Sequence, residues 1–244
     1  MLIDLHAHTS GISKCCRIPA PEVLRIAKEN GIDGIVLANH YQKSYVKDMT
    51  VADFASKYIE EYAYTKSLAD EMGMKIFFGI EVTMSKCDDA HVLVYGLTPV
   101  FLREYPDLFD YTLEELYKLV RVRGGALVHA HPYRHGKDVL DLDYLDGVEV
   151  NCHPLYDDTH CNRLYEVAKN AGVMLTCGGD YHADTNRANC GTYIPDSISD
   201  SIAIGEYIRS TDEIRFLMQE PNRDEINEVS YRRGIGVNLV RSAL

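Results

Sequence analysis

The chain has 244 residues, 46% of them hydrophobic, and a formal net charge of −12 at pH 7. This length and composition fit one α/β barrel or two small domains with a large buried core. Because like charges repel, the acidic balance disfavours general binding to long nucleic acid or to anionic membranes and favours a small substrate.

The seven cysteines and the N-terminus predict a reducing compartment. The cysteine count is odd, the spacing is irregular and no CxxC pair occurs, so we expect no disulfide framework. The segment from Met1 to His6 lacks the basic-then-apolar pattern of a signal peptide, and no apolar run reaches the length of a membrane span. The sequence therefore predicts a cytoplasmic protein that does not enter the membrane.

The first half of the chain alternates strand and helix patterns. Short apolar runs predict buried strands over residues 2–6, 34–38, 75–81 and 91–95. A helix begins near Pro21 and stops at Gly31, and a longer helix spans Val51 to Met72 and ends near Gly73.

The second half continues the alternation. We expect helices over 113–122, 164–171 and 202–218, and strands over 126–131, 147–151 and 173–178. The tail over 220–244 has no clear pattern. Strands rich in Val, Ile and Leu that are separated by helices predict a parallel sheet, and about seven such units favour a closed α/β barrel. We expect one domain over 1–244, with its motifs within 4–182 and with residues 197–244 completing the barrel or forming a tail.

Several common enzyme motifs are missing. No GxGxxG follows the first strand and no GxxxxGK[ST] occurs, which argues against dinucleotide and P-loop nucleotide binding. No GxSxG is present to indicate a serine hydrolase.

The first strand ends in Asp4-Leu5-His6-Ala7-His8-Thr9-Ser10. Residues two apart in a strand point to the same side, so His6 and His8 can hold one metal ion together. A single HxH is common by chance, and two solvent-exposed histidines on a loop would look the same.

The same kind of side chain recurs at the other predicted strands. In a parallel barrel the carboxyl ends of the strands meet at one mouth. This recurrence favours a shared metal site over coincidence, although a hydrogen-bonded core histidine remains the alternative for any single position, especially His129. The further residues are His40, Glu81, His91, His131, Glu149, Asp180 and His182.

Histidines with carboxylates and no required thiolate suit zinc, manganese or iron. A carboxylate can bridge two such ions, which then polarise a phosphoryl oxygen and generate hydroxide from water. Phosphoryl transfer needs mainly positioning and charge neutralisation, which this set supplies.

The ordered set D-L-H-A-H-T, N-H, G-I-E, H-V-L-V-Y-G, H-P-Y-R and G-G-D-Y-H resembles the polymerase and histidinol phosphatase (PHP) family over residues 4–182. The resemblance implies a distorted (βα)7 barrel, two or three divalent metal ions and hydrolysis of phosphate esters. It also implies a phosphate-binding role for Arg134. The implied metal ligands are His6, His8 and Asp180 for the first ion, Glu81 as a bridge, His91 and His131 for the second ion, and His40 and His182 for a third.

Two stretches depart from the family pattern. Many three-metal relatives have His or Asp near position 14, where this chain reads Ser-Lys-Cys-Cys-Arg over 13–17, and Asp or Glu where it has Asn39. Lys14 or Arg17 could neutralise substrate phosphate in place of a cation. Alternatively, Cys15 or Cys16 could supply a thiolate ligand, or both cysteines could be packed residues.

The leading hypothesis is a phosphomonoesterase that acts on a small phosphorylated metabolite through a metal-bound hydroxide. Arg134 and the metals would stabilise the developing charge, and Asp180 or His182 would move protons. His153 follows the strand of Glu149 and could contact substrate, while Glu149 could orient a ligand histidine.

Three alternatives remain. A nuclease or phosphodiesterase would need a basic groove with stacking aromatics, and the chain has 17 tyrosines but no tryptophan and no clustered Lys/Arg run. A non-catalytic, metal-binding regulatory protein is permitted by Lys14 and Asn39. An amidohydrolase-like C–N hydrolase would share the HxH start.

Overall fold

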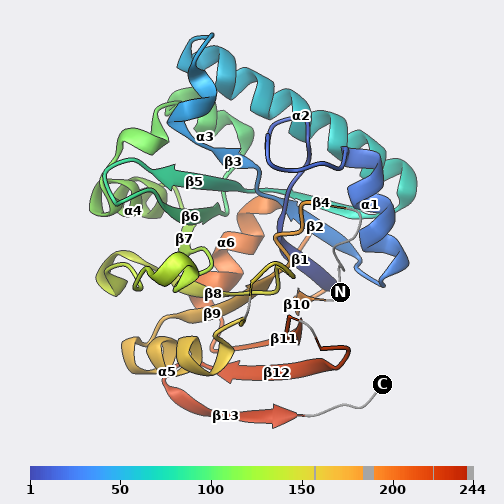
Figure 1. The fold of residues 1–244 in the computed structure, drawn as a ribbon, viewed down its shortest axis with the longest axis vertical. Helices are drawn as coiled ribbons and strands as arrows, with labels where there is room; N and C mark the ends of the chain where they lie inside the picture. Colours follow the sequence, from blue (N-terminus) through green and yellow to red (C-terminus); the bar gives the residue numbers. More distant parts are fainter. Residues whose placement is uncertain (157, 184–189, 222, 241–244) are drawn as a thin grey trace.

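The computed structural model describes residues 1–156, 158–183, 190–221 and 223–240. Its strands form two sheets flanked by helices (Figure 1). The first sheet has the order β13-β12-β11-β10-β1-β2-β4 and the second has the order β3-β5-β6-β7-β8-β9.

The first sheet is parallel on one side and antiparallel on the other. β1, β2 and β4 run parallel, while β10, β11, β12 and β13 pair antiparallel in turn, beginning at β1. Its strands are β1 (Leu2–Ala7), β2 (Gly34–Leu37), β4 (Lys75–Phe78), β10 (Gly191–Tyr193), β11 (Glu213–Gln219), β12 (Ile226–Arg232) and β13 (Ile235–Val240).

The second sheet is mixed. β3 pairs parallel with β5, and β7, β8 and β9 are parallel, but β6 is antiparallel to both β5 and β7. The expectation of a purely parallel sheet is therefore wrong. Its strands are β3 (His40–Tyr41), β5 (Ile80–Met84), β6 (Ala90–Tyr95), β7 (Ala126–His129), β8 (Gly147–Asn151) and β9 (Met174–Gly178).

The two sheets meet along short chain segments. β2 leads into β3 and β4 leads into β5 with the break at Gly79, whose N–H donates to the Leu37 carbonyl at 3.1 Å. On the other side, the Asp180 N–H donates to the His6 carbonyl at 2.8 Å, which places the end of β1 beside the segment after β9. Because the ladders in the described residues form two sheets, the closed barrel expected from the sequence is not confirmed. The junctions nevertheless bring the ends of β1, β3, β5 and β9 together.

The helices begin and end at the signals in the sequence. The Thr50 side chain and Asp53 form a capping box at the start of α2, and Gly73 ends it with φ +69°. The predicted helix over 113–122 is confirmed. The helices are α1 (Ala20–Glu29), α2 (Val51–Met72), α3 (Pro99–Glu104), α4 (Leu113–Val122), α5 (Cys161–Ala171) and α6 (Ser201–Ser210), with 3₁₀ turns at Lys43–Val46, Leu108–Asp110, Arg134–Gly136 and Leu142–Tyr144.

The helix predicted over 202–218 is wrong in its second half. α6 ends at Ser210, and β11 follows, with Ile214, Phe216 and Met218 buried and Glu213 exposed. This alternation has the period of a strand, and the ladder with β10 and β12 satisfies the backbone. The tail that lacked a sequence pattern supplies β12 and β13, while residues 241–244 lie outside the described part. Among the described helices, none has both the length and the apolar character needed to span a bilayer.

α6 approaches the end of β6 so closely that a side chain has no room at Gly205. A Cβ on Gly205 would lie 2.5 Å from the Gly96 Cα. We expect Gly205→Ala to lower the free energy of unfolding by about 2 kcal/mol, because overpacking outweighs the gain of about 1 kcal/mol in helix propensity. Urea unfolding would measure the change, and Glu206→Ala on the exposed side of α6 is the control. Equal stability of the two variants would contradict this prediction.

Candidate metal centre

Eight side chains expected from the sequence to bind metal converge where the strand ends meet. They come from six strands or the residues that follow them, and all but two are buried. His40 on β3 lies opposite Glu81 on β5 in the ladder. The full set is His6, His8, His40, Glu81, His91, His131, Asp180 and His182.

The Glu81 carboxylate lies at the centre of this cluster and is fully buried. Its Oε1 is 2.7 Å from His91 Nδ1 and 2.9 Å from His131 Nε2. Its Oε2 is 3.5 Å from the Nε2 atoms of both His6 and His8, and it also contacts His40 Nδ1. One carboxylate thus faces five imidazoles, which is the arrangement needed for a bridging ligand.

Asp180 approaches the cluster from the other side. Its Oδ1 is 2.9 Å from His8 Nε2 and 3.7 Å from His6 Nε2. The residue has a left-handed backbone, with φ +48°, and is held by its N–H bond to the His6 carbonyl. Asp180 Oδ1 and Glu81 Oε2 are both buried and face imidazole nitrogens, but neither makes a hydrogen bond of good geometry. Buried acceptors without partners require an explanation.

A chain of hydrogen bonds fixes the tautomer of His8. The Thr9 N–H donates to Asn39 Oδ1 at 2.8 Å, and the Ser13 hydroxyl donates to the same oxygen at 2.8 Å. The Ser13 oxygen therefore accepts from His8 Nδ1, 3.0 Å away. A neutral His8 consequently carries its lone pair on Nε2, which faces the cluster.

His6 is oriented in the same way. Its Nδ1 donates to Glu149 Oε1 at 2.8 Å, so the neutral ring has its lone pair on Nε2. The Nε2 atoms of His6 and His8 lie only 3.0 Å apart. When both rings are neutral, as metal binding requires, two nitrogen lone pairs and the oxygens of Glu81 and Asp180 face one space. This set of acceptors fits a divalent cation.

Electrostatics agree with this assignment. Burial raises the pKa of Glu81, but the charges of the surrounding histidines outweigh it and hold the pKa well below its usual range. Burial also raises the pKa of Asp180, but the nearby His6 and His8 outweigh it and hold that pKa well below its usual range. Both carboxylates are therefore anionic and available to a metal.

Glu149 also positions a second part of the site. Its Oε2 accepts from the His131 N–H at 3.0 Å and from Asn151 Nδ2 at 3.1 Å. The His131 backbone is left-handed, with φ +35°. Glu149 thus orients both His6 and His131, in line with the role expected for it from the sequence.

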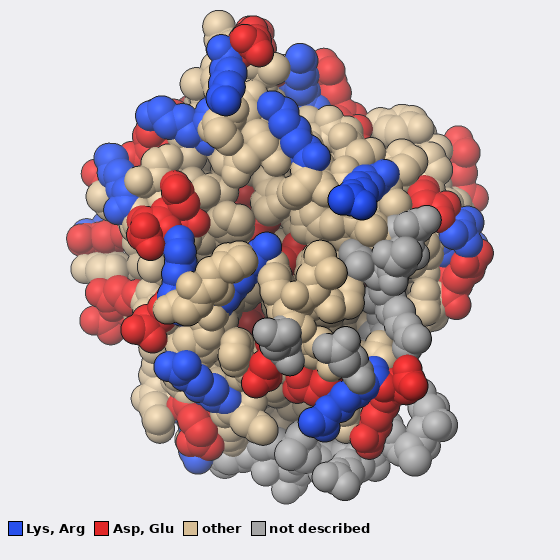
Figure 2. Space-filling view, in the orientation of Figure 1, with Lys and Arg blue, Asp and Glu red and all other residues tan. Residues whose placement is uncertain are grey.

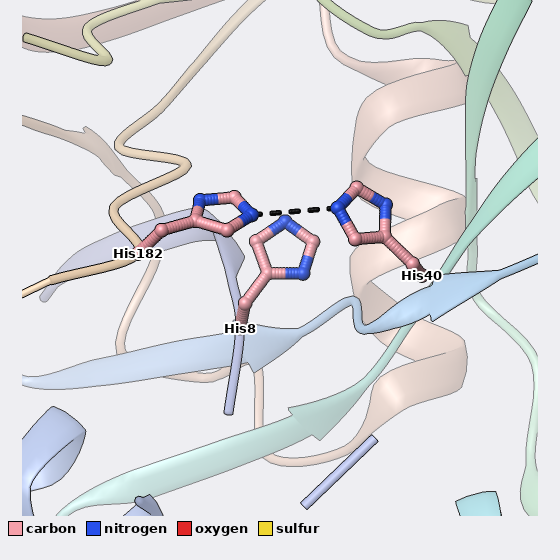
Figure 3. Close-up of side chains that lie close together, drawn as sticks. All are labelled: His8, His40 and His182. Atoms are coloured by element: carbon pink, nitrogen blue, oxygen red, sulfur yellow. Dashed lines mark hydrogen bonds between the residues drawn. The ribbon is translucent and has the colours of Figure 1, made fainter. Parts of the chain in front are cut away.

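A second group of ligand atoms lies beside the first. The imidazoles of His8, His40 and His182 face one another, and each comes from a different segment (Figure 3). The Nε2 atoms of His40 and His182 are 3.4 Å apart. His182 Nδ1 donates to the Asp180 carbonyl at 2.7 Å, which fixes this ring relative to Asp180.

A pocket opens next to the cluster, with a volume of about 550 Å³. Arg134 lies between the two: its Nη1 is 3.3 Å from His131 Nε2 and 3.8 Å from Asp180 Oδ2, and its guanidinium stacks over the Tyr156 ring at 4.3 Å. Arg134 and Tyr156 both line the pocket. The positive charge of Arg134 therefore lies where an anionic group of a substrate in the pocket would meet the candidate metal ligands.

The other proposed phosphate contacts are placed differently. Lys14 Nζ lies over the Tyr45 ring at 4.6 Å, and Arg17 is exposed. In the described residues no side-chain contact links Lys14 or Arg17 to the cluster. His153 is buried, with its ring centroid 4.8 Å from that of Tyr156 and 5.4 Å from that of His182.

Some residues of the site were not predicted from the sequence. Asp4 is buried, accepts from the N–H groups of His6 and Gly179 at 2.9 Å each, and has its pKa raised by burial to about 7. Its position two residues before His6, on the same side of β1, could have indicated it. Three buried cysteines, Cys152, Cys177 and Cys190, also gather, with sulfur atoms within 4.8 Å of one another.

His129 is a core histidine rather than a ligand. It is buried, and its Nδ1 accepts from the Leu140 N–H at 3.2 Å. Burial, with the charges of His131 and His91, lowers the pKa of His129 to about 3. The folded state therefore keeps it neutral, while the unfolded state takes up a proton below about pH 6.5.

His129 should consequently make the protein sensitive to acid. The contribution of neutral His129 to the free energy of unfolding is fully present above pH 6.5 and is lost as the pH drops toward 3. Between pH 7 and pH 5 this loss amounts to about 2 kcal/mol. We expect His129→Asn, which keeps an acceptor for Leu140, to remove that share of the pH dependence in urea unfolding of the metal-free chain. His135→Asn, at an exposed position, is the control. An unchanged pH dependence in His129→Asn would contradict the assignment.

Comparisons place this arrangement among known folds. No family model and no curated protein sequence matches the chain, but solved structures do. PsfC from Pseudomonas syringae is 20% identical, with 89% of this chain and 91% of that chain covered and a TM-score of 0.61. A two-domain protein from Bacteroides vulgatus that contains a predicted PHP-like metal-dependent phosphoesterase is 14% identical, with a TM-score of 0.58. The match covers 96% of this chain and 65% of that longer one.

A third similar structure is an amidohydrolase from Chromobacterium violaceum with bound sulfate and no metal. It is 16% identical, with 85% of this chain and 96% of that chain covered and a TM-score of 0.53. At these identities the likeness concerns the fold, and the fold agrees with the family resemblance seen in the motifs. The chain therefore shares its fold with these three proteins, one of which contains a predicted PHP-like metal-dependent phosphoesterase.

Proposed function

We propose that the protein is a metal-dependent phosphoesterase that hydrolyses a small phosphate monoester. The observation that carries this proposal is the position of Arg134, between a set of converging metal ligands and a pocket of about 550 Å³. A guanidinium offers paired donors that match a phosphate group. The pocket has the size of a small-molecule site.

The ligand set divides into two groups that share Glu81. In the first group, His6 and His8 face Glu81 Oε2 and also Asp180 Oδ1. In the second group, His91 and His131 face Glu81 Oε1. Divalent manganese, zinc or iron bound here would activate water and polarise a phosphoryl oxygen. A distorted (βα)7 barrel, closed between β1 and β9, is the arrangement we propose for the strands that carry these ligands.

The protein's own side chains would orient the substrate. Arg134 binds the phosphate, and its stacking on Tyr156 fixes the plane of the guanidinium. His153 Nδ1 accepts from the Leu155 N–H at 3.1 Å, so the neutral ring carries its proton on Nε2 and can donate it to a substrate oxygen. We assign proton movement during hydrolysis to Asp180, whose Oδ2 is 3.8 Å from Arg134 Nη1, and to His182, whose ring centroid is 5.4 Å from that of His153.

The surface favours a small substrate over long nucleic acid. Figure 2 shows basic side chains separated by acidic and uncharged ones on the face in view, rather than gathered along a groove. With the net charge of −12, this pattern gives little electrostatic attraction to a polymeric phosphate backbone.

The test is a substrate panel with the chelated protein and with the same protein given Mn²⁺, Zn²⁺ or Fe²⁺. We expect phosphate release from small monoesters only with metal, and little cleavage of labelled single-stranded DNA or of amides. Cleavage of DNA alone would favour the phosphodiesterase, and cleavage of amides alone would favour the C–N hydrolase. Metal binding without any turnover would favour a regulatory protein.

A further inference from the structure

We propose that Cys152, Cys177 and Cys190 form a three-sulfur site that binds a soft, thiophilic metal ion, Cu⁺. The three sulfur atoms lie within 4.8 Å of one another, and those of Cys152 and Cys177 are 3.7 Å apart. All three are free thiols, with exposed fractions of 8%, 0% and 1%. The site thus combines three ligands of one chemical kind in the interior of the protein.

The three-sulfur site is separate from the candidate metal centre. Gly178 on β9 faces that centre, because a Cβ built on it would lie 2.5 Å from the His6 Cβ and 2.7 Å from Glu149 Oε1. Successive side chains of a strand point to opposite faces. Cys177 therefore points away from the centre, and its thiol donates to the Leu217 carbonyl of β11 at 3.4 Å. The inference consequently does not depend on the proposed function.

Three segments of the two sheets bring the sulfurs together. Cys152 follows β8, Cys177 lies in β9, and Cys190 directly precedes β10. The Cys152 N–H donates to the Gly178 carbonyl at 3.0 Å, and the Thr192 hydroxyl donates to the Cys177 carbonyl at 3.2 Å. Because β9 belongs to the second sheet and β10 to the first, an ion bound here would cross-link the two sheets.

The spacing and the donor set suit a three-coordinate ion. A metal–sulfur bond of about 2.3 Å gives a sulfur–sulfur edge of about 4.0 Å when three sulfurs surround an ion in one plane. This edge lies between the 3.7 Å that separates Cys152 from Cys177 and the 4.8 Å within which all three sulfurs lie. Structural zinc takes four ligands, and the group found in the described part of the chain holds three sulfurs without a histidine or a carboxylate. Soft sulfur ligands alone therefore favour Cu⁺.

Binding needs no co-reactant. Thiol protons are released to solvent as the sulfur–copper bonds form, the copper remains Cu⁺, and no sulfur is oxidised. The three cysteines belong to an apolar core that also contains Val150 and Phe216, which keeps bulk water away from the ion. Sulfur bound to Cu⁺ absorbs in the near ultraviolet, which gives a signal that does not depend on catalysis.

The experiment is an anaerobic titration of the reduced, metal-free full chain with Cu⁺, followed by its ultraviolet absorption and by copper X-ray absorption. We expect a sulfur-to-copper band that saturates at one equivalent, and a copper shell of three sulfurs at about 2.3 Å. Cys177→Ser and Cys190→Ser should lose this band. Cys161→Ser, which changes a buried cysteine outside the group, is the matched control and should keep it.

A shell of nitrogen around the first equivalent of copper in the wild type would overturn the proposal, because it would place that ion among the histidines. A band of wild-type size in Cys177→Ser would overturn it as well. The X-ray absorption is measured on the wild type, so the test holds even where a variant does not fold. Phosphate release is measured separately, and a wild type with the sulfur shell but no hydrolysis would refute the proposed function alone.

Discussion

Glu81→Gln is expected to lower kcat for phosphate release roughly 10³-fold and to empty both metal positions that share this carboxylate. Glutamine keeps the size of the side chain but removes the charge that faces five histidines. Losing several kcal/mol of metal-dependent charge stabilisation corresponds to about three orders of magnitude in rate. The measurements are steady-state kinetics at saturating Mn²⁺ and elemental analysis of the dialysed protein.

The matched control for this variant is Glu60→Gln, on the exposed side of α2. It should keep its metal and its rate. Thermal unfolding of both chains would establish that they are folded. If Glu81→Gln retained its full metal content and kcat, Glu81 would not be the bridge and the site would have to be reassigned.

Arg134→Ala is expected to lower kcat/KM for a phosphate monoester on the order of 10²-fold, while metal content stays unchanged. The loss has the size found when one preorganised charge-stabilising donor is removed. Arg134→Lys should recover only part of it, because an ammonium has neither the planar fork nor the same stacking on Tyr156.

Arg163 offers a control of the same chemistry. Its guanidinium lies over the Tyr133 ring at 3.5 Å, and its side chain is 61% exposed. Arg163→Ala removes an arginine stacked on tyrosine without touching the ligand cluster, so its kcat/KM should match the wild type. Equal losses in Arg163→Ala and Arg134→Ala, or loss of metal in the latter, would contradict the phosphate-binding role.

The sequence predicted the assembly of the site better than the arrangement of the strands. The metal-ligand candidates stood at or just beyond apolar runs, and side chains at strand ends must face a common edge when the strands are neighbours. The direction of β6 was not predictable in this way, since an apolar strand reads the same in a parallel and in an antiparallel ladder. β11 was not predicted because it begins shortly after α6 ends, and its alternating apolar residues were interpreted as a continuation of the helix.

The orientation of the ligands depended on bonds that no local pattern encodes. The tautomer of His8 is set through Ser13 by Asn39, which lies 26 positions further along the chain from that serine. Such contacts appear only once distant segments have been packed together.

The scattering of the ligands has a consequence for biogenesis. The side chains that gather at the candidate metal centre come from His6 near the start of the chain and from Asp180 and His182 far along it. A nascent polypeptide that has emerged only as far as β8 lacks Asp180 and His182, so the group that these residues form with His6 and His8 is still incomplete. If the proposed ions bind, we therefore expect uptake at this group to come late in folding, and we expect a chelator to destabilise the protein as well as inhibit it.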